Sequence, residues 1–159
     1  MTAITRRVFA ISAASSVAAM GNASKAAAEA RLVDKRLLGR WESDAKKSAE
    51  YNETHVKLTD AARDVMRQMM GKCTYEFRDA DYDVDIPAHT FKGADGRVFE
   101  FENFHETVSY SLLGSTSKSI AIKHAFLKIE EITVVNFEDE FIWIYDDATH
   151  WREYFKRVK

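Results

Sequence analysis

From residue 73 to the C-terminus, apolar and polar residues alternate with a period of two over most of the chain. In residues 73–77, for example, Cys73, Tyr75 and Phe77 fall on one side, and the residues between them are polar. Successive side chains of a β-strand point to opposite faces of a sheet, so this pattern predicts strands that are buried on one face. Comparable stretches, joined by short polar connections, lie within residues 78–89, 93–104, 106–114, 119–129, 131–140, 140–147 and 150–159.

Ahead of these stretches, residues 37–42 predict one further short strand, and the spacing of apolar residues then becomes helical. Thr59 is a favourable N-cap, and Gly71 a favourable stop, for a helix over residues 60–70. One side of this helix is apolar and carries Ala62, Val65, Met66, Met69 and Met70. Many short antiparallel strands and one substantial helix after the first strand predict a mainly β domain, either a sandwich or a barrel.

The first 30 residues have the layout of an export signal rather than of a folded domain. Arg6 and Arg7 precede a weakly apolar run over residues 8–20, which an alanine-rich segment follows. The run is too short and too rich in Ala and Ser to span a bilayer, which takes about 20 apolar residues. We therefore divide the chain into a signal peptide, residues 1–30, and one domain, residues 31–159, which keeps no stable membrane anchor once the signal is removed.

The residues around the arginine pair, Thr-Arg-Arg-Val-Phe at positions 5–9, resemble the twin-arginine export signal. The Leu-Lys that usually follows in that signal is Ala10-Ile11 here. An ordinary secretory signal with two chance arginines is the alternative interpretation. The resemblance implies that the twin-arginine translocase exports the domain already folded, and that the protein is periplasmic or secreted.

Charge and cysteine content narrow the classes of function. The chain has a formal net charge of −2 at pH 7, and its one basic cluster, residues 152–159, is interleaved with aromatic residues. Nucleic-acid binding needs clustered Lys and Arg to displace counterions from phosphates, so we predict no nucleic-acid partner. Cys73 is the single cysteine, which excludes an intramolecular disulfide and favours a small buried apolar residue over a nucleophile.

A Gly-X-Trp tripeptide, residues 39–41, stands on the first predicted strand, and the last predicted strand carries basic residues. Together with the strand series between them, these features resemble the lipocalin or wider calycin family. In that family the tryptophan lies across the closed end of the barrel, and a basic side chain from near the C-terminus packs over the indole. The resemblance implies an up-and-down antiparallel β-barrel of about eight strands in which Gly39, Trp41 and either Arg152 or Arg157 close one end.

The resemblance is confined to the two ends of the domain and to its strand content. The segment over residues 44–71 is longer than the compact first loop of lipocalins. The central Thr-Asp-Tyr motif of larger lipocalins is not found at the expected place. The middle of the chain therefore adds nothing to the resemblance.

No arrangement of residues in the sequence is typical of a catalytic or metal site. The histidines have no close metal-ligand spacing, and residues 111–119 lack the Gly-X-Ser-X-Gly spacing of a nucleophilic serine. Four aspartates over residues 79–85 alternate along a strand, which directs them into solvent rather than around one calcium ion. We predict no catalytic residue, no metal and no cofactor. His105 and His124 are on strands and face either a barrel interior or the surface.

The aromatic residues of the strands favour a container for a small hydrophobic molecule, because ligand pockets are mostly apolar with a few polar anchors. We predict that the residues lining it include Tyr75, Tyr82, Phe99, Phe101, Tyr110, Phe126 and Trp143. The alternative is a barrel filled by its own side chains that acts as a protein-interaction module in the envelope. A small cone-shaped α+β enzyme is a third option, disfavoured because it requires several helices ahead of a curved sheet.

Overall fold

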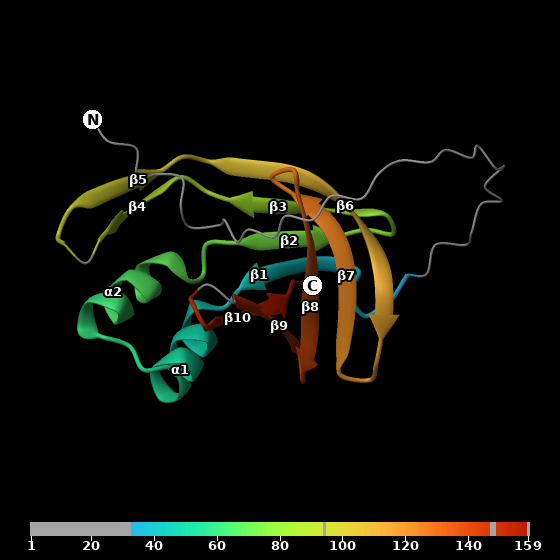
Figure 1. Ribbon diagram of the computed structural model, residues 1–159, viewed down its shortest axis with the longest axis horizontal. Helices are drawn as coiled ribbons and strands as arrows, with labels where there is room; N and C mark the ends of the chain where they lie inside the picture. Colours follow the sequence, from blue (N-terminus) through green and yellow to red (C-terminus); the bar gives the residue numbers. More distant parts are fainter. Residues whose placement is uncertain (1–32, 94, 147–148, 159) are drawn as a thin grey trace, which may run out of the picture.

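The computed structural model describes residues 33–93, 95–146 and 149–158, so the predicted signal peptide lies outside the described residues. Within these residues, eight antiparallel strands form a closed barrel in the order β1-β10-β9-β8-β7-β6-β3-β2 (Figure 1). The barrel strands are β1 (Gly39–Ser43), β2 (Thr74–Phe77), β3 (Asp81–Ile86), β6 (Phe104–Ser115), β7 (Ser119–Phe126), β8 (Ile129–Glu138), β9 (Phe141–Asp146) and β10 (Trp151–Arg157). The prediction of a mainly β, up-and-down antiparallel barrel is confirmed, and the sandwich alternative is excluded.

Between β3 and β6 the chain forms a separate two-stranded ribbon of β4 (His89–Lys92) and β5 (Val98–Phe101). In Figure 1 this ribbon continues β3 and β6 beyond one end of the barrel, on the same side as both helices. Its second strand falls within the predicted stretch 93–104, whereas β4 was not predicted, since only His89 of it falls within a predicted stretch.

The structure has two helices between β1 and β2 where one was predicted: α1 (Ala45–His55) and α2 (Asp60–Met69). The predicted helix is α2, in which the Thr59 side chain accepts from Ala62 N and Gly71 follows in a left-handed conformation, φ +81°. In the described part of the chain, neither helix is long and apolar enough to cross a membrane.

Helix α1 gave no apolar pattern because the residues that it buries, Ser48 and Asn52, are polar. The Ser48 hydroxyl accepts from Tyr154 N at 2.9 Å. The Asn52 amide donates to the Arg152 carbonyl at 2.8 Å and accepts from Arg152 N at 2.9 Å. These backbone groups belong to the part of β10 beyond its pairing with β1, which begins at Phe155. The helix therefore takes the place of a neighbouring strand. Its side chains supply hydrogen-bond partners to backbone groups of β10 that would otherwise lack them.

Helix α2 contacts the β4–β5 ribbon in the same way, through one amide side chain that binds the backbone of a strand. The Gln68 side chain accepts from Lys92 N at 2.7 Å and donates to the Lys92 carbonyl at 3.2 Å. One amide side chain from each helix thus makes a two-bond contact with the backbone of a strand. The ribbon and both helices are in this way fixed beside one end of the barrel.

Strand register defines two ends of the barrel. The closed end holds the start of β1 and the end of β10, together with residues 34–38, and it lies on the right in Figure 1. The open end holds the end of β1, the start of β10 and the hairpin between β7 and β8. The core is densest toward the closed end and comprises Leu37, Trp41, Cys73, Phe77, Tyr82, Val84, Val108, Tyr110, Ile120, Ile122, Val135, Ile142 and Phe155.

Three of the four aspartates, Asp81, Asp83 and Asp85, lie on the outer face of β3, because Tyr82 and Val84 between them belong to the core, and Asp79 precedes the strand. Arg78 pairs with Asp81 at 2.6 Å and with Asp83 at 2.7 Å. Hydrogen bonds from Arg78 hold the pKa of the Asp83 carboxyl well below its usual range. These carboxylates form a surface ion-pair network.

Candidate functional site

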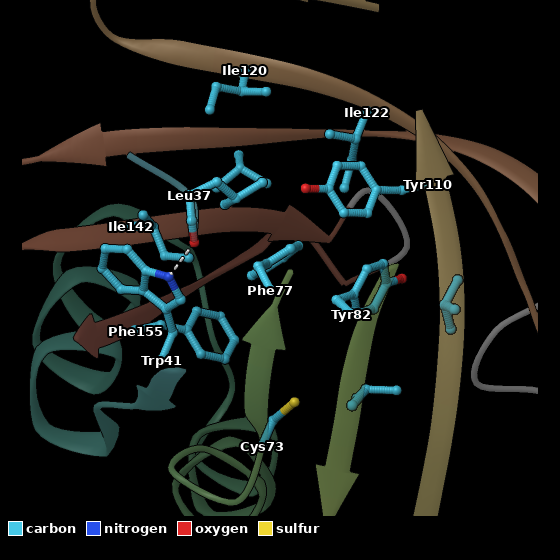
Figure 2. Close-up of a cluster of buried hydrophobic side chains, with 13 residues drawn as sticks. Leu37, Trp41, Cys73, Phe77, Tyr82, Tyr110, Ile120, Ile122, Ile142 and Phe155 are labelled. Atoms are coloured by element: carbon cyan, nitrogen blue, oxygen red, sulfur yellow. Dashed lines mark hydrogen bonds between the residues drawn. The ribbon is translucent and has the colours of Figure 1, made fainter. Parts of the chain in front are cut away.

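The indole of Trp41 is buried toward the closed end of the barrel, with 3% of the residue exposed. Its Nε1 donates to the Leu37 carbonyl at 2.7 Å, the bond drawn dashed in Figure 2. Trp41 and Arg157 are direct partners in the β1–β10 ladder, and the guanidinium carbon of Arg157 lies 4.5 Å from the ring centroid. Arg157 also donates to the Arg36 carbonyl. Of the two candidate basic partners, Arg157 is the one that stacks on the indole.

Arg152 occupies a different place, on the outer face of the barrel under α1. Its guanidinium carbon lies 3.8 Å from the Tyr51 ring centroid and 3.6 Å from that of Trp143. Ile142 is in the core, so Trp143 next to it points outward. Trp143, predicted to contact a ligand inside the barrel, instead helps to attach α1 to the outside.

Gly39 adopts φ +106°, a left-handed conformation that side chains other than glycine rarely take. An added Cβ at this position would meet open space. The glycine is therefore needed for the backbone conformation at the start of β1, and not for a close approach of two chains.

The other predicted ligand residues fall into three places. Tyr82 and Tyr110 are buried in the core, and Tyr75 packs against it with partial exposure. Phe126 is at the open end. Phe99 and Phe101 are on β5 of the ribbon, where they stack on Phe91 and His89, with centroids 5.3 and 5.0 Å apart. The ribbon pair therefore lies outside the barrel wall, and whether any of these residues binds a ligand stays a prediction.

Toward the closed end Leu37, Trp41, Phe77, Ile120 and Val135 are buried, whereas most inward-facing residues at the open end are partly buried and Glu131 is exposed. The residues at the open end alternate with outward residues on the same strands as the core, which fixes their direction. We call this set the mouth; it consists of the apolar Tyr75, Ile86, Phe104, Phe126 and Ile144 and the polar Ser43, Glu106, Glu131, Thr133 and Glu153.

A hydrogen-bonded chain of three side chains lies beneath the mouth. The Tyr82 hydroxyl is 2.9 Å from His124 Nδ1, and His124 Nε2 is 2.8 Å from the Thr133 hydroxyl. Only 7% of His124 is exposed, and burial lowers the pKa of its imidazole. The ring is therefore neutral at pH 7, and both of its nitrogens are occupied.

Two carboxylates face inward at this end of the barrel, Glu131 and Glu106. Glu131 is the direct β8 partner of His124, with Oε1 3.6 Å from Nε2, and burial raises the pKa of its carboxyl. Glu106 is the direct β6 partner of the core residue Val84, and its Oε2 is buried without a hydrogen-bond partner among the described residues. Burial, followed by the charges of Glu131 and Glu106, raises the pKa of the Tyr82 hydroxyl.

A third carboxyl, Glu153 on β10, joins the barrel wall to the end of α2. It accepts from the Ser43 hydroxyl, and Ser43 Oγ in turn accepts from Gly71 N at 2.9 Å. Burial raises the pKa of Glu153 to about 7, and the hydrogen bonds from Ser43 and the Gly71 backbone lower it by less. A surface hollow of about 530 Å³ reaches this point, with Ser43, Gly71 and Cys73 among its lining residues.

Comparison of the chain with protein-family models, with curated proteins and with solved structures found no match. The site is consequently described by its own geometry and chemistry.

The arrangement is suited to holding a molecule by hydrogen bonds and apolar contact. Burial raises the pKa of both the Cys73 thiol and the Tyr75 hydroxyl, which keeps them protonated and weakly nucleophilic at pH 7. Across residues 33–93, 95–146 and 149–158, no group of three or more His, Cys, Asp or Glu side chains is placed to hold a metal ion.

Sequence reasoning missed the carboxylates of the mouth. Glu106, Glu131 and Glu153 each stand two residues from an inward-facing residue, so strand alternation could have predicted that they face inward. That signal was overlooked because charged residues are usually assigned to the solvent face. His124 was noted as able to face inward, but its partners Tyr82 and Thr133 come from other strands.

Proposed function

We propose that the protein binds a small, mainly apolar molecule at the mouth of its barrel without converting it chemically. The observation that carries this proposal is the difference in burial between the two ends. Leu37, Trp41, Phe77, Ile120 and Val135 toward the closed end are buried, whereas Phe104, Phe126 and Ile86 at the open end keep contact with solvent. A barrel that served only as a packed scaffold would gain about 25 cal/mol for each Å² of this apolar surface that it covered.

The chemistry of the mouth supports the same proposal. Phe104 and Phe126 pack edge to face with centroids 5.8 Å apart, and they offer an apolar surface next to the polar groups around His124. Small-molecule sites are typically apolar surfaces with a few polar groups that fix orientation. Glu106 Oε2, which has no hydrogen-bond partner among the described residues, provides such a group.

A second candidate function is supported by the outer face of β8. Ile132 and Val134 point outward with 63% and 46% of each residue exposed, and Tyr145 on β9 is 44% exposed. Exposed apolar groups on one face are typical of protein-interaction surfaces. An envelope module that binds another protein through this face is therefore the alternative.

Titration with N-phenyl-1-naphthylamine, which is uncharged at pH 7 and fluoresces in apolar sites, tests the proposed function. Ile86 pairs with Phe104 at the rim, and Ile86→Trp is expected to weaken binding at least tenfold because the larger ring occupies the mouth. Glu76→Trp adds the same ring on the exposed face of β2 and is expected to bind like the unchanged protein. Absence of saturable binding, or equal affinities in all three proteins, would count against a site in the mouth.

We also propose that the barrel is lipocalin-like and that the twin-arginine route exports it to the periplasm. The Gly39, Trp41 and Arg157 arrangement supports the first part, and residues 5–9 support the second. Replacing Arg6 and Arg7 by Lys is expected to leave the precursor in the cytoplasm, measured by cell fractionation in an export-competent host. Unchanged export of the double variant would instead indicate the general secretory channel.

A further inference from the structure

We propose that two copies of this chain associate edge to edge through β8, so that the β7–β8 hairpins of both copies form one continuous antiparallel sheet. This inference does not depend on ligand binding at the mouth. It follows from a strand edge that has no neighbouring strand, from the direction of its backbone groups, and from the side chains along it.

Strand β8 extends beyond its pairing with β9. The ladder between β8 and β9 ends at Val135 and Ile144, whereas the ladder between β8 and β7 continues to Ile129. Among the described residues, the part of β8 before Val135 therefore has a strand on one side only. We call residues 129–134 the free edge. Thr133 is half-buried, and the other residues of the free edge are exposed, so a second strand has access to it.

The backbone of the free edge directs hydrogen-bonding groups toward its unoccupied side. Phe137 N donates at 2.8 Å to the carbonyl of Lys118, which lies opposite Phe137 when the β7–β8 register is continued by one residue. In an antiparallel ladder, the N–H and C=O groups of successive residues point alternately to the two sides of the strand. Odd-numbered residues of β8 therefore bond to β7, whereas the N–H and C=O groups of Glu130 and Ile132 point away from it. These groups can pair with an added strand.

A second copy of the free edge fits a register that keeps the carboxylates apart. In an antiparallel pair about a twofold axis at Ile132, this residue meets its own equivalent. Glu130 then lies opposite Val134, and Glu131 lies opposite Thr133. The hydrogen-bonded partners in this register are even-numbered residues of both copies, whose backbone groups point to the unoccupied side. An axis at Glu131 would instead place this carboxylate opposite itself, and like charges directly opposite are destabilising.

Pairing of two copies also covers exposed apolar side chains. Ile132 and Val134 are on the outer face of the free edge, with 63% and 46% of each residue exposed, and the pairing brings them next to their equivalents. Glu130, the charged residue on this face, is balanced by Lys123 of its own chain at 3.0 Å. An identical copy supplies both an unpaired edge and matching apolar side chains, which makes a second copy the partner that this edge fits.

Sedimentation velocity over a hundredfold range of protein concentration tests the inference. We expect the unchanged chain to shift from monomer to dimer as its concentration rises. Ile132→Lys places two like charges together at the twofold axis and is expected to weaken the dimer at least tenfold. Val98→Lys is the matched control, because Val98 is 69% exposed and is on β5, which also pairs with one strand only; it is expected to leave the dimer within twofold.

Two results of this measurement would overturn the inference. One is a chain that stays monomeric at about 1 mM, the dissociation constant of an association of about 4 kcal/mol. The other is a dimer that Ile132→Lys leaves intact or that Val98→Lys weakens as much.

Cysteine cross-linking tests the register. Ile132→Cys is expected to give a disulfide-linked dimer on oxidation with diamide, because direct partners in a hydrogen-bonded antiparallel pair have Cα atoms about 5.5 Å apart, within the range of a disulfide. The native Cys73 is buried, so the unchanged chain is expected to stay unlinked, and so is Val98→Cys with an added thiol on β5. Absence of the link in Ile132→Cys, or equal linking of Val98→Cys, would overturn the inference.

Discussion

Trp41→Ala is expected to lower the free energy of unfolding by about 3 to 5 kcal/mol, the cost of removing a large aromatic side chain from a packed core. The indole is 3% exposed, so its replacement leaves a cavity at the closed end. The change also removes the hydrogen bond to the Leu37 carbonyl and the surface on which Arg157 stacks.

Chemical denaturation of the domain, followed by far-ultraviolet circular dichroism, measures this loss. Trp41→Phe keeps an aromatic plug and loses the N–H donor, and is expected to cost about 1 to 2 kcal/mol. Tyr145→Ala removes an exposed ring from β9 and is expected to cost less than about 1 kcal/mol. A loss below 1 kcal/mol for Trp41→Ala would show that the indole does not act as a buried plug.

Glu153→Gln is expected to make the domain more stable above pH 7 and to flatten its stability between pH 4.5 and 7. Burial raises the pKa of Glu153 from its ordinary 4.5 to about 7, so in this interval the folded protein binds more protons than the unfolded chain. Stability then falls as the pH rises, and reaches a plateau above pH 7. The difference of pKa corresponds to about 3 kcal/mol between the two plateaus.

The measurement is a set of urea unfolding curves for Glu153→Gln and the unchanged protein at half-unit steps from pH 4.5 to 8.5. The quantity compared is the difference in unfolding free energy, which cancels the contributions of other carboxyls such as Asp83. Glu140→Gln is the control: it removes an exposed carboxylate paired with Lys156 at 3.0 Å, retains Glu153, and should therefore keep the slope. Parallel curves for Glu153→Gln and the unchanged protein would contradict the assigned burial of this carboxyl.

The strands and the closed end were predictable because their signals are local. Alternation along β3, β6, β7 and β10 predicts which residues share a face. The buried core residues of these strands lie on the predicted faces. Trp41 was placed by resemblance, and the ladder then selected Arg157, its direct partner, over Arg152. Alternation alone was insufficient there, because it does not say which residue of a distant strand lies opposite.

The remaining features depend on contacts between distant segments. Helix α1 was invisible because Asn52 is held by the β10 backbone rather than by apolar packing. Trp143 was assigned to the interior because aromatic residues are usually buried, yet it is covered from outside by Arg152. The Glu131 carboxylate comes next to His124 only when β7 and β8 are side by side. Sequence reasoning therefore predicted the strands of the barrel better than the polar residues that face its interior.

The most direct test of a ligand site at the mouth is nuclear magnetic resonance of the isoleucine δ1-methyl groups during titration with N-phenyl-1-naphthylamine. The account predicts saturable shifts at Ile86 and Ile144, which face inward at the open end, and small or no shifts at Ile120 and Ile142 in the packed core. Shifts confined to the exposed outer-face Ile132, or no saturable shift at any methyl group, would contradict it.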